Sequence, residues 1–426
     1  MAPPASNIEL RHRPRAARLG RRGFLRLSGA APLAMLTAPS RGGAAAAKPD
    51  AAGERSAAGA QPVTLFLCGD VMTGRGIDQV LPHPGSPRIC EAYMTSAKGY
   101  VRLAEQANGP IPRPVDFAYV WGEALAELAR RAPDLRIVNL ETAVTTSEDC
   151  TDKGISYRMS PENLPCLTAA GIDCCALANN HVLDWGPAGL VDTLASLERA
   201  GIESAGAGRA ARAAAPAVLE LAGRGRVLVF AFGTASSGIP RDWAAAENRP
   251  GVNLLPDLSA ASLEGVAARV GAARRPGDLV VASIHWGENW GYYIPEAERD
   301  FARGLIDRAG VHVVYGHSSH HPKGIEVYRE RLVLYGCGDF LDDYEGIRGY
   351  ERYRDDLVLM YFARLAPESG RLLACEMVPL QIRNFRLNRA APEDARWLGA
   401  VLNREGEMLG TRVEPGADGA LTLRWG

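Results

Sequence analysis

"IDCCALANNHVLDWG", residues 172–186, is a short apolar run that ends directly in polar side chains. Its length and apolar character are typical of a buried strand. Asn179, Asn180 and His181 follow the run, and Asp184 and Gly186 come within the next five residues. In α/β proteins the carboxyl ends of the strands face the ligand. The stretch therefore indicates either a metal or catalytic corner, or a capped turn.

The same pattern recurs along the chain. Further apolar runs read "VTLFLCGD", "RIVNLE", "RVLVFAFG", "DLVVASIHWG", "VHVVYGHS", "RLVLYGCGDF" and "DLVLMYFARL". Between the runs, helical spacing appears in "VWGEALAELARRA", "PAGLVDTLASLERAG", "SLEGVAARVGAA" and "PEAERDFARGLIDRAG". This alternation predicts an α/β domain with layered sheets and outer helices. Residues 82–118 are expected to form a long loop over the site. A C-terminal extension from about residue 388 should add a helix at 392–403 and a last strand.

Composition limits the class of protein. The chain has 426 residues, 47% hydrophobic and 23% charged, as in ordinary globular proteins. Its first 50 residues carry nine Lys or Arg against two acidic residues, while the whole chain sums to −1. The remaining body is therefore acidic, at about −8, which argues against a nucleic-acid groove.

The basic N-terminal region contains "GRRGFLRLSGAAPLAMLTAPS", in which Arg21 and Arg22 precede a short apolar stretch. It resembles a twin-arginine export signal, with a cleavage region near Ala45–Ala47. The stretch is too short for a membrane-spanning helix of about 20 residues. We therefore expect a signal region at 1–47, a flexible linker at 48–61 and the folded domain at 62–426. The protein is then exported, with an uncleaved signal as a possible membrane anchor. A disordered basic tail is the alternative.

Eight cysteines occur without a CxxC pair, so a structural zinc site is not expected. Most lie in apolar runs, where a thiol is usually a small buried hydrophobe. The more polar Cys90, Cys150 and Cys166 leave room for one disulfide in an oxidising compartment, but their spacing does not fix its pairing.

Polar residues stand at the ends of successive apolar runs. Any one of these residues alone is explained as a helix cap or turn residue, or as a histidine with a structural role. The series is harder to explain as independent caps, and it comprises Asp70, Glu141, Asn179, Asn180, His181, His285, His317, His320 and Asp339. Oxygen and imidazole donors without thiolate suit Mn²⁺, Fe or Zn²⁺. One or two such ions would polarise an ester and activate water.

The order of these motifs is informative in itself. "FLCGDVMTGRGID", "VNLETAVT", "ALANNHVLDWG", "SIHWGENW" and "GHSSHHPKGIEVYRERLVLYGCGDFL" resemble the CapA family of poly-γ-glutamate capsule biosynthesis proteins, from about Val63 to about Leu387. That family is similar to calcineurin-type metallophosphoesterases. The resemblance implies an α/β fold in the form of a four-layer α/β/β/α sandwich, with a divalent metal site at the strand ends.

The resemblance also implies individual roles. His181 corresponds to the catalytic histidine, oriented by Asp184 as a carboxylate behind it. The implied metal ligands are Asp70, Glu141, Asn180, His285, His317 and His320. Asp339 is expected to support the histidine ligands rather than to bind metal.

Three departures from the phosphoesterase pattern matter. Met72 occupies the place of a histidine two residues after the first aspartate, and a thioether is a poor ligand for a hard metal. Glu141 is the only candidate for the bridging carboxylate. His320 follows Gly316 by four residues, one more than usual. These changes put a second metal and phosphoester hydrolysis in doubt.

Substrate contacts are predicted for Arg75, Trp286 and Lys323. Arg75 would clamp an anionic group, or it is a surface residue near a helix. Trp286, with its neighbours Trp290, Tyr292 and Tyr293, walls a groove or is buried packing. Lys323 and His321 are expected at the rim, and Tyr157 and Arg158 are further loop candidates.

Three functional hypotheses follow. The first is an exported, metal-dependent, CapA-like hydrolase that acts on an envelope polymer or peptide-like substrate in poly-γ-glutamate synthesis, with membrane capsule machinery as a partner and no nucleic acid. In it, His181 protonates the leaving group. The second is a metal-dependent peptide epimerase, in which His181 or His285 removes an α-proton. The third is a non-catalytic, metal-stabilised scaffold for polymer synthesis.

Overall fold

The computed structural model describes residues 61–151 and 153–426. The predicted signal region at 1–47, and the predicted linker at 48–61 apart from Gln61, lie outside these described residues. The first strand, β1, begins at Val63, next to the expected start of the folded domain. In the part of the chain that the structure describes, no helix has the length and apolar character needed to cross a membrane.

The larger of two main sheets has eleven strands of mixed direction. In its central part β1 pairs in parallel with β3 and antiparallel with β17, while β2 continues β1 past Gly69 and pairs in parallel with β3 and β16. The strands are β1 (Val63–Cys68), β2 (Asp70–Val71), β3 (Leu135–Leu140), β6 (Cys174–Ala176), β7 (Glu203–Ala205), β16 (Asp339–Leu341), β17 (Leu357–Leu365), β18 (Leu372–Ile382), β19 (Leu387–Arg389), β20 (Thr411–Pro415) and β21 (Leu421–Trp425).

The second sheet has six strands in the order β14-β15-β13-β12-β10-β9. Its four central strands β15, β13, β12 and β10 run in parallel. The bounds are β9 (Ala217–Leu221), β10 (Gly225–Gly233), β12 (Leu279–His285), β13 (Val313–His317), β14 (Ile325–Tyr328) and β15 (Arg331–Leu334). Two small pairs complete the described strands: β4 (Ala143–Val144) with β5 (Arg158–Met159), and β8 (Ala207–Gly208) with β11 (Gly251–Val252).

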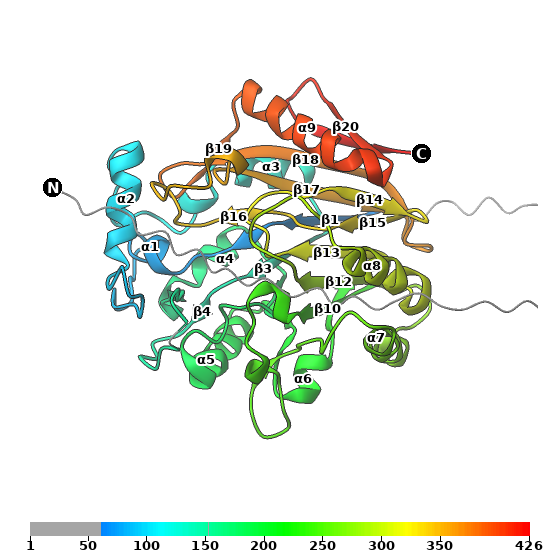
Figure 1. Cartoon of the computed structure of the whole chain (residues 1–426), viewed down its shortest axis with the longest axis horizontal. Coiled ribbons are helices and arrows are strands. Elements are labelled where there is room, and N and C mark those ends of the chain that lie inside the picture. Colours follow the sequence, from blue (N-terminus) through cyan, green and yellow to red (C-terminus); the bar gives the residue numbers. More distant parts are fainter. Residues whose placement is uncertain (1–60, 152) are drawn as a thin grey trace, which may run out of the picture. The chain divides into compact units, whose positions relative to one another are not determined.

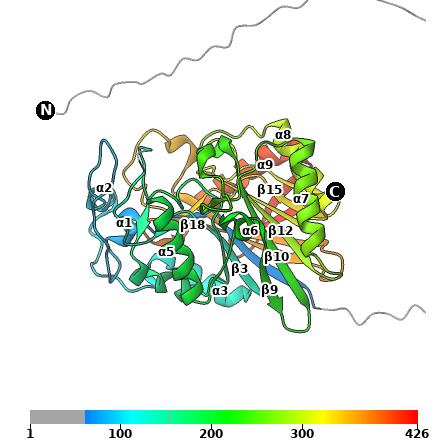
Figure 2. The same ribbon diagram turned by 90° about the horizontal axis from the view of Figure 1, so that it is seen from below.

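Side chains of β10 alternate between two hydrophobic clusters, as the period of two in a strand requires. Val227, Val229 and Ala231 belong to the cluster that holds most of the first sheet. Their neighbours Leu228, Phe230 and Phe232 belong to the cluster that includes α7 (Ala260–Ala273) and α8 (Glu296–Ala309). One face of the second sheet therefore packs with the first sheet, and the other is covered by α7 and α8 (Figures 1 and 2).

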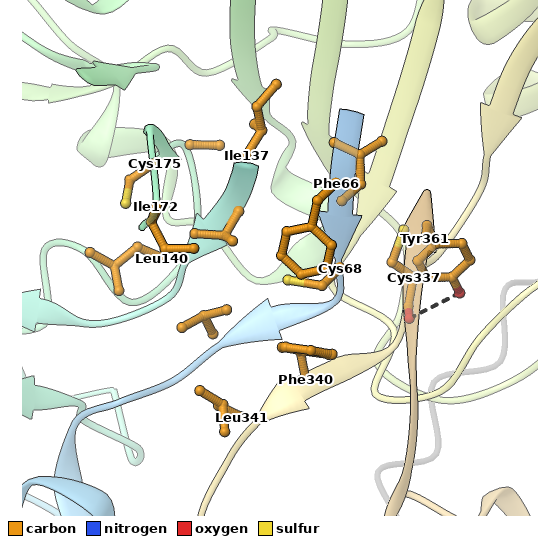
Figure 3. Packing of buried hydrophobic residues seen from close by; sticks show 14 of the residues in the cluster. Phe66, Cys68, Ile137, Leu140, Ile172, Cys175, Cys337, Phe340, Leu341 and Tyr361 are labelled. Carbon is orange, nitrogen blue, oxygen red and sulfur yellow. Dashed lines mark hydrogen bonds between the residues drawn. The ribbon is translucent and has the colours of Figure 1, made fainter. Parts of the chain in front are cut away.

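The first sheet packs helices against its own apolar side chains. Phe66 of β1 lies 6.0 Å from Phe340 and 5.6 Å from Phe362, measured between ring centroids. Figure 3 shows Phe66 and Phe340 in this packing, together with the Tyr361 hydroxyl that donates to the Cys337 carbonyl over 3.3 Å. The same cluster receives residues from α3 (Ala124–Arg131), α4 (Pro165–Ala169) and α5 (Gly186–Arg199).

The sequence prediction of a mixed α/β protein is confirmed. Helices α3, α5, α7 and α8 form where helical spacing was found, and α9 (Pro392–Gly406) and β21 form in the C-terminal stretch. The segment 82–118 differs from the expected long loop, because it contains α2 (Lys98–Asn108), whose Tyr100, Val101 and Ala104 are buried. The remaining helices are short: α1 (Arg75–Asp78), α6 (Ala210–Ala214) and the 3-10 turns η1 to η6 (Tyr119–Trp121, Pro161–Asn163, Ala235–Ser237, Arg241–Trp243, Glu351–Tyr353, Glu407–Leu409).

One disulfide forms among the described cysteines, between Cys90 and Cys150. This resolves the pairing that the sequence left open. Cys166, the third candidate, is free and buried, and the other five cysteines are likewise buried thiols.

Candidate metal centre and catalytic pocket

Three predicted ligands meet where the two sheets present their strand ends. His285 closes β12 and His317 closes β13, and the parallel register places the two residues directly side by side. Asp70 comes from β2 of the first sheet. One ligand atom from each of Asp70, His285 and His317 lies within 4.8 Å of the others, and all three residues are buried. These residues form a possible metal-binding triad.

The imidazoles of the triad are held by specific contacts. Nδ1 of His285 lies 2.8 Å from Nδ1 of His317, and Nε2 of His317 lies 2.7 Å from the Ser283 hydroxyl. Burial lowers the pKa of both histidines, that of His317 to about 3. Both rings are therefore neutral at pH 7, and neutral imidazole is the form that binds metal. A buried carboxylate facing two neutral imidazoles fits a divalent ion such as Zn²⁺, Mn²⁺ or Fe²⁺.

Asn139 positions the carboxylate of the triad, and the sequence analysis missed it. Its Nδ2 donates to Oδ1 of Asp70 over 2.8 Å and lies 3.4 Å from Oε2 of Glu141. Its Oδ1 accepts from Nδ2 of Asn179 over 3.0 Å. The available signal was the spacing in "VNLE", because residues two apart on a strand share one face.

Gly69 allows the first sheet to bring this carboxylate into place. A Cβ at Gly69 would lie 2.0 Å from the Gly338 carbonyl oxygen, so a larger residue cannot occupy this position without displacing backbone. The close approach lets the Asp70 N–H donate to that carbonyl over 2.9 Å. It also sets Asp70 opposite Asp339 in the parallel pair of β2 and β16.

Glu141 and Asn180 stand next to the triad. Oε1 of Glu141 lies 3.7 Å from Nε2 of His285 and 3.8 Å from Nε2 of His181. Oδ1 of Asn180 lies 3.1 Å from Nε2 of His285. Burial, followed by the Asp70 charge, raises the pKa of Glu141 well above its usual value. A cation between these carboxylates would relieve their repulsion.

His181 and Asp184 form a closely coupled pair. Nδ1 of His181 lies 2.6 Å from Oδ2 of Asp184, which also accepts the Tyr157 N–H over 2.7 Å. The Asn179 side chain fixes the turn between them, because its Oδ1 accepts the N–H groups of His181 and Val182. With the Nδ1 proton directed at Asp184, the unprotonated Nε2 lies on the side of the ring that faces Glu141 and is free to accept a proton. The structure thus places both predicted catalytic residues together.

Lys153 is a second residue that the sequence analysis missed. Its Nζ lies 3.0 Å from Oδ1 of Asp184 and 3.2 Å from Nδ1 of His181, and it donates to the Asn180 carbonyl. The loop that carries Lys153 follows Cys150 of the disulfide. A lysine in a polar loop gives no local signal of this role, because only the tertiary fold brings it to His181.

His320 is close to the triad but is not part of it. Its Nδ1 lies 2.8 Å from Oδ1 of Asp339 and its Nε2 lies 2.8 Å from Nδ2 of Asn289. Asp339 therefore supports a histidine, as expected, although the histidine it supports is not one of the triad. Burial lowers the pKa of His320 to about 4.

A pocket of about 460 Å³, the candidate catalytic pocket, opens beside the triad. Asn180, His181 and His320 contribute to its wall. Trp290 also lines the pocket, where it stacks on Tyr350 with ring centroids 4.0 Å apart and lies 5.2 Å from the His320 ring. The pocket thus combines a polar, histidine-rich wall with an aromatic wall, an arrangement typical of ligand sites.

Arg75 lines this pocket, but its charge is already neutralised. It is 2% exposed, and its Nε donates to Oδ2 of Asp343 over 2.9 Å while Nη1 lies 3.3 Å from Oε1 of Glu91. The guanidinium also stacks over the Tyr100 ring at 3.6 Å. Arg75 therefore shapes the pocket rather than offering a free positive charge.

The structure does not bring Trp286 and Lys323 to the pocket, which corrects the prediction of substrate contact for both. Trp286 is 1% exposed and its indole N–H donates to the Tyr335 carbonyl over 2.9 Å, within the core beneath α8. Lys323 is 3% exposed, and its charge lies near Glu298. The aromatic residue of this segment that does line the pocket is Trp290.

Met72 shows why the missing histidine leaves no gap. It is fully buried, and its sulfur lies 3.7 Å from the Tyr344 hydroxyl. The Tyr344 hydroxyl donates to this thioether, so the side chain at the position of the missing histidine already has a partner. Apart from the triad, the predicted metal ligands are Glu141, Asn180 and His320. Of these, His320 already contacts Asp339 through its Nδ1.

The fold and this site define a mixed α/β protein with a possible metal centre at its strand ends. The chain belongs to the family described as bacterial capsule synthesis protein PGA_cap, whose model matches residues 64–344. The predicted membership of the CapA family is thereby confirmed.

Individual relatives agree with this assignment. A probable polyglutamine synthesis accessory protein of Mycobacterium tuberculosis is 49% identical over 364 residues, covering 85% of this chain and 96% of the relative. The PGA biosynthesis protein CapA of Bacillus subtilis is 28% identical over 322 residues, covering 75% and 72%. The capsule biosynthesis protein CapA of Bacillus anthracis is 24% identical over 324 residues, covering 76% and 68%.

Proposed function

We propose that this protein is a metal-dependent hydrolase of the cell envelope that cleaves a poly-γ-glutamate-type polymer during capsule synthesis. The observation that carries the proposal is the convergence of Asp70, His285 and His317 next to the His181–Asp184 pair, with His181 lining the adjoining pocket. The relatives named for capsule and polyglutamine synthesis support the choice of polymer. Export through the twin-arginine-type signal, and work beside membrane capsule machinery, are parts of the same proposal.

The layered packing supports a finer description of the fold. We propose the four-layer α/β/β/α sandwich, with α3 to α5 outside the first sheet and α7 and α8 outside the second. The division of β10 side chains between two clusters supports the inner layers. In this arrangement the ends of strands from both sheets converge, as the triad requires.

A divalent ion held by the triad would polarise the scissile bond and activate water. The chain itself supplies the proton transfers. Burial lowers the pKa of His181 to about 4, so the ring is neutral at pH 7. With Nδ1–H directed at Asp184, Nε2 accepts the proton of the attacking water, and the Asp184 carboxylate stabilises the imidazolium. Nε2 then returns the proton to the leaving group.

The test uses the full-length protein and compares wild type with Asp70→Ala, His317→Ala and the exposed control His83→Ala. Elemental analysis gives the metal content, and hydrolysis is measured on a γ-linked glutamate oligomer and on bis(p-nitrophenyl) phosphate. We expect metal and hydrolysis in wild type and His83→Ala, and loss of both in the triad variants. Metal bound without hydrolysis of either substrate would refute the hydrolase and favour a scaffold or an epimerase. Absence of metal under all loading conditions would refute the centre itself.

A further inference from the structure

A second cavity continues the catalytic pocket away from the triad. This cavity, of about 240 Å³, shares Tyr344, Ile347 and Asp355 with the catalytic pocket. Its wall also contains Asp342, Glu345 and Asp356. We call it the acidic cavity. The acidic cavity therefore adjoins the pocket that His181 lines, and several carboxyl groups stand in its wall.

The positive charges of the catalytic pocket do not balance this region. Arg75 is paired with Asp343 and Glu91, and Lys153 is paired with Asp184. Asp355 forms no ion pair with any described residue, although it is partly buried and lines both cavities. The two pockets together therefore present an uncompensated carboxylate to a ligand.

Asp342, in the wall of the same cavity, adds a carboxyl group with one unsatisfied oxygen. The residue is 2% exposed, and while its Oδ1 accepts the Tyr344 N–H over 2.9 Å, its Oδ2 has no hydrogen-bond partner among the described residues. Burial and the Asp339 charge raise the pKa of Asp342 well above its usual value. A positive charge nearby would offset this repulsion, and a buried carboxylate oxygen without a partner is otherwise costly.

The other carboxylates of the cavity have partners already. Glu345 accepts the N–H groups of Asn384 and Phe385, and Asp356 accepts Arg354 and Gln381. Arg383, the one arginine in the cavity wall, is exposed. The negative charge available to a ligand thus comes from Asp355, while Asp342 offers its unpartnered Oδ2 to a hydrogen-bond donor.

We propose that the acidic cavity binds a primary ammonium group of the substrate while the scissile bond lies at the triad. This inference rests on the proposed function and refines it. The γ-carboxamide backbone of polyglutamate carries a carboxylate on every unit, and Asp355 would repel these groups. The free amino end is the one cationic point of such a chain, and Asp355 would attract it. The protein would therefore act near the amino end of the polymer.

The experiment measures binding of γ-linked glutamate pentamers to the full-length, metal-loaded protein by calorimetry. One pentamer has a free amino end, a second is N-acetylated, and a third is N-acetylated but carries a lysine at its other end. The variants are Asp355→Asn and Asp342→Asn, with Glu351→Gln as the control, since Glu351 is an exposed acid on the same segment. All three substitutions replace a carboxyl group with an amide of nearly the same size.

We expect wild type and Glu351→Gln to bind the free pentamer at least tenfold more tightly than the acetylated one. In Asp355→Asn this preference should fall below threefold, and Asp342→Asn should reduce it as well. Tight binding of the lysine pentamer would assign the ammonium to a diamino-acid side chain rather than to the chain end. Equal binding of all three pentamers by wild type, or binding of none, would overturn the proposal.

Hydrolysis measured on the same samples separates the two proposals. Cleavage of free and acetylated pentamers at equal rates would leave the hydrolase standing and overturn the ammonium site. If the protein prefers the free pentamer but cleaves none of the pentamers, the ammonium site stands and the hydrolase is overturned.

Discussion

Nδ1 of His181 lies 2.6 Å from Oδ2 of Asp184, and this contact leaves the opposite ring nitrogen, Nε2, 3.8 Å from Oε1 of Glu141. A single turn separates the two residues. Asn179 stabilises this turn, because its Oδ1 accepts the N–H groups of His181 and Val182. The geometry of the proposed proton transfers thus depends on groups that touch neither metal nor substrate.

Replacing Asp184 with Asn should lower the hydrolytic rate without removing the metal. The amide cannot stabilise the imidazolium as a carboxylate does, and loss of such a supporting group typically costs about 10-fold to 100-fold. Steady-state kinetics on the γ-glutamate oligomer, with elemental analysis of the same samples, provide the check. Asp192→Asn is the control, because Asp192 only accepts the Thr145 hydroxyl. An unchanged rate would show that Asp184 has a purely structural role.

Replacing Ser283 with Ala should weaken metal binding. The Ser283 hydroxyl lies 2.7 Å from Nε2 of His317 and so directs Nδ1 toward Asp70 and His285. Removing this contact leaves the ring less well oriented, and we expect about a tenfold loss of affinity. Competition with a chelator of known affinity measures it. The prediction fails if the variant holds the metal as tightly as wild type at the same chelator concentration.

His312 should make the stability of the fold dependent on pH, far from the metal centre. Its Nδ1 accepts the Val280 N–H over 2.9 Å, and burial lowers its pKa to about 3. The folded state therefore binds fewer protons than the unfolded state between that value and the ordinary pKa of about 6.5, so stability falls as pH drops below 6.5. One pKa unit corresponds to about 1.4 kcal/mol.

His312→Asn tests this, because the asparagine Oδ1 can replace the acceptor without titrating. Urea unfolding at pH 7 and at pH 5 should show wild type losing about 2 kcal/mol more than the variant over this range. Equal losses in the two proteins would argue that His312 does not carry the linkage.

Removing the Cys90–Cys150 disulfide should destabilise the protein. The bond closes a loop with a sequence separation of 60, and constraints of this kind contribute about 2–4 kcal/mol. Cys90→Ala combined with Cys150→Ala should therefore lower the midpoint of denaturant unfolding. Addition of a reductant should destabilise wild type but leave the double variant unchanged. A reductant effect of equal size in both would mean that another bond is involved.

Much of the candidate site could be predicted from short motifs. Asp70, His285 and His317 each end an apolar run, and the parallel pairing of the strands makes such ends converge. His181 and Asp184 are close in sequence, so their contact needed only the turn between them. For Trp286 the sequence left a groove wall and buried packing both open, because an aromatic residue at the end of a strand shows the same local pattern in either place, and the side chain lies in the core. Its indole N–H found a partner inside the protein, at the Tyr335 carbonyl.

The sequence by itself determined the α/β class, the family and the residues whose chemistry suits a metal, because these depend on local periodicity and on the order of motifs. The tertiary structure decided which of those residues share one centre, since His320 pairs with Asp339 and stays outside the triad. It also brought Asn139 and Lys153 to the site, and it joined Asp342 and Asp355 in one cavity. The pairing of β2 with β3 brings Asn139 to Asp70, and the packing of the two sheets brings Asp70 to His285 and His317, which are far away in the chain.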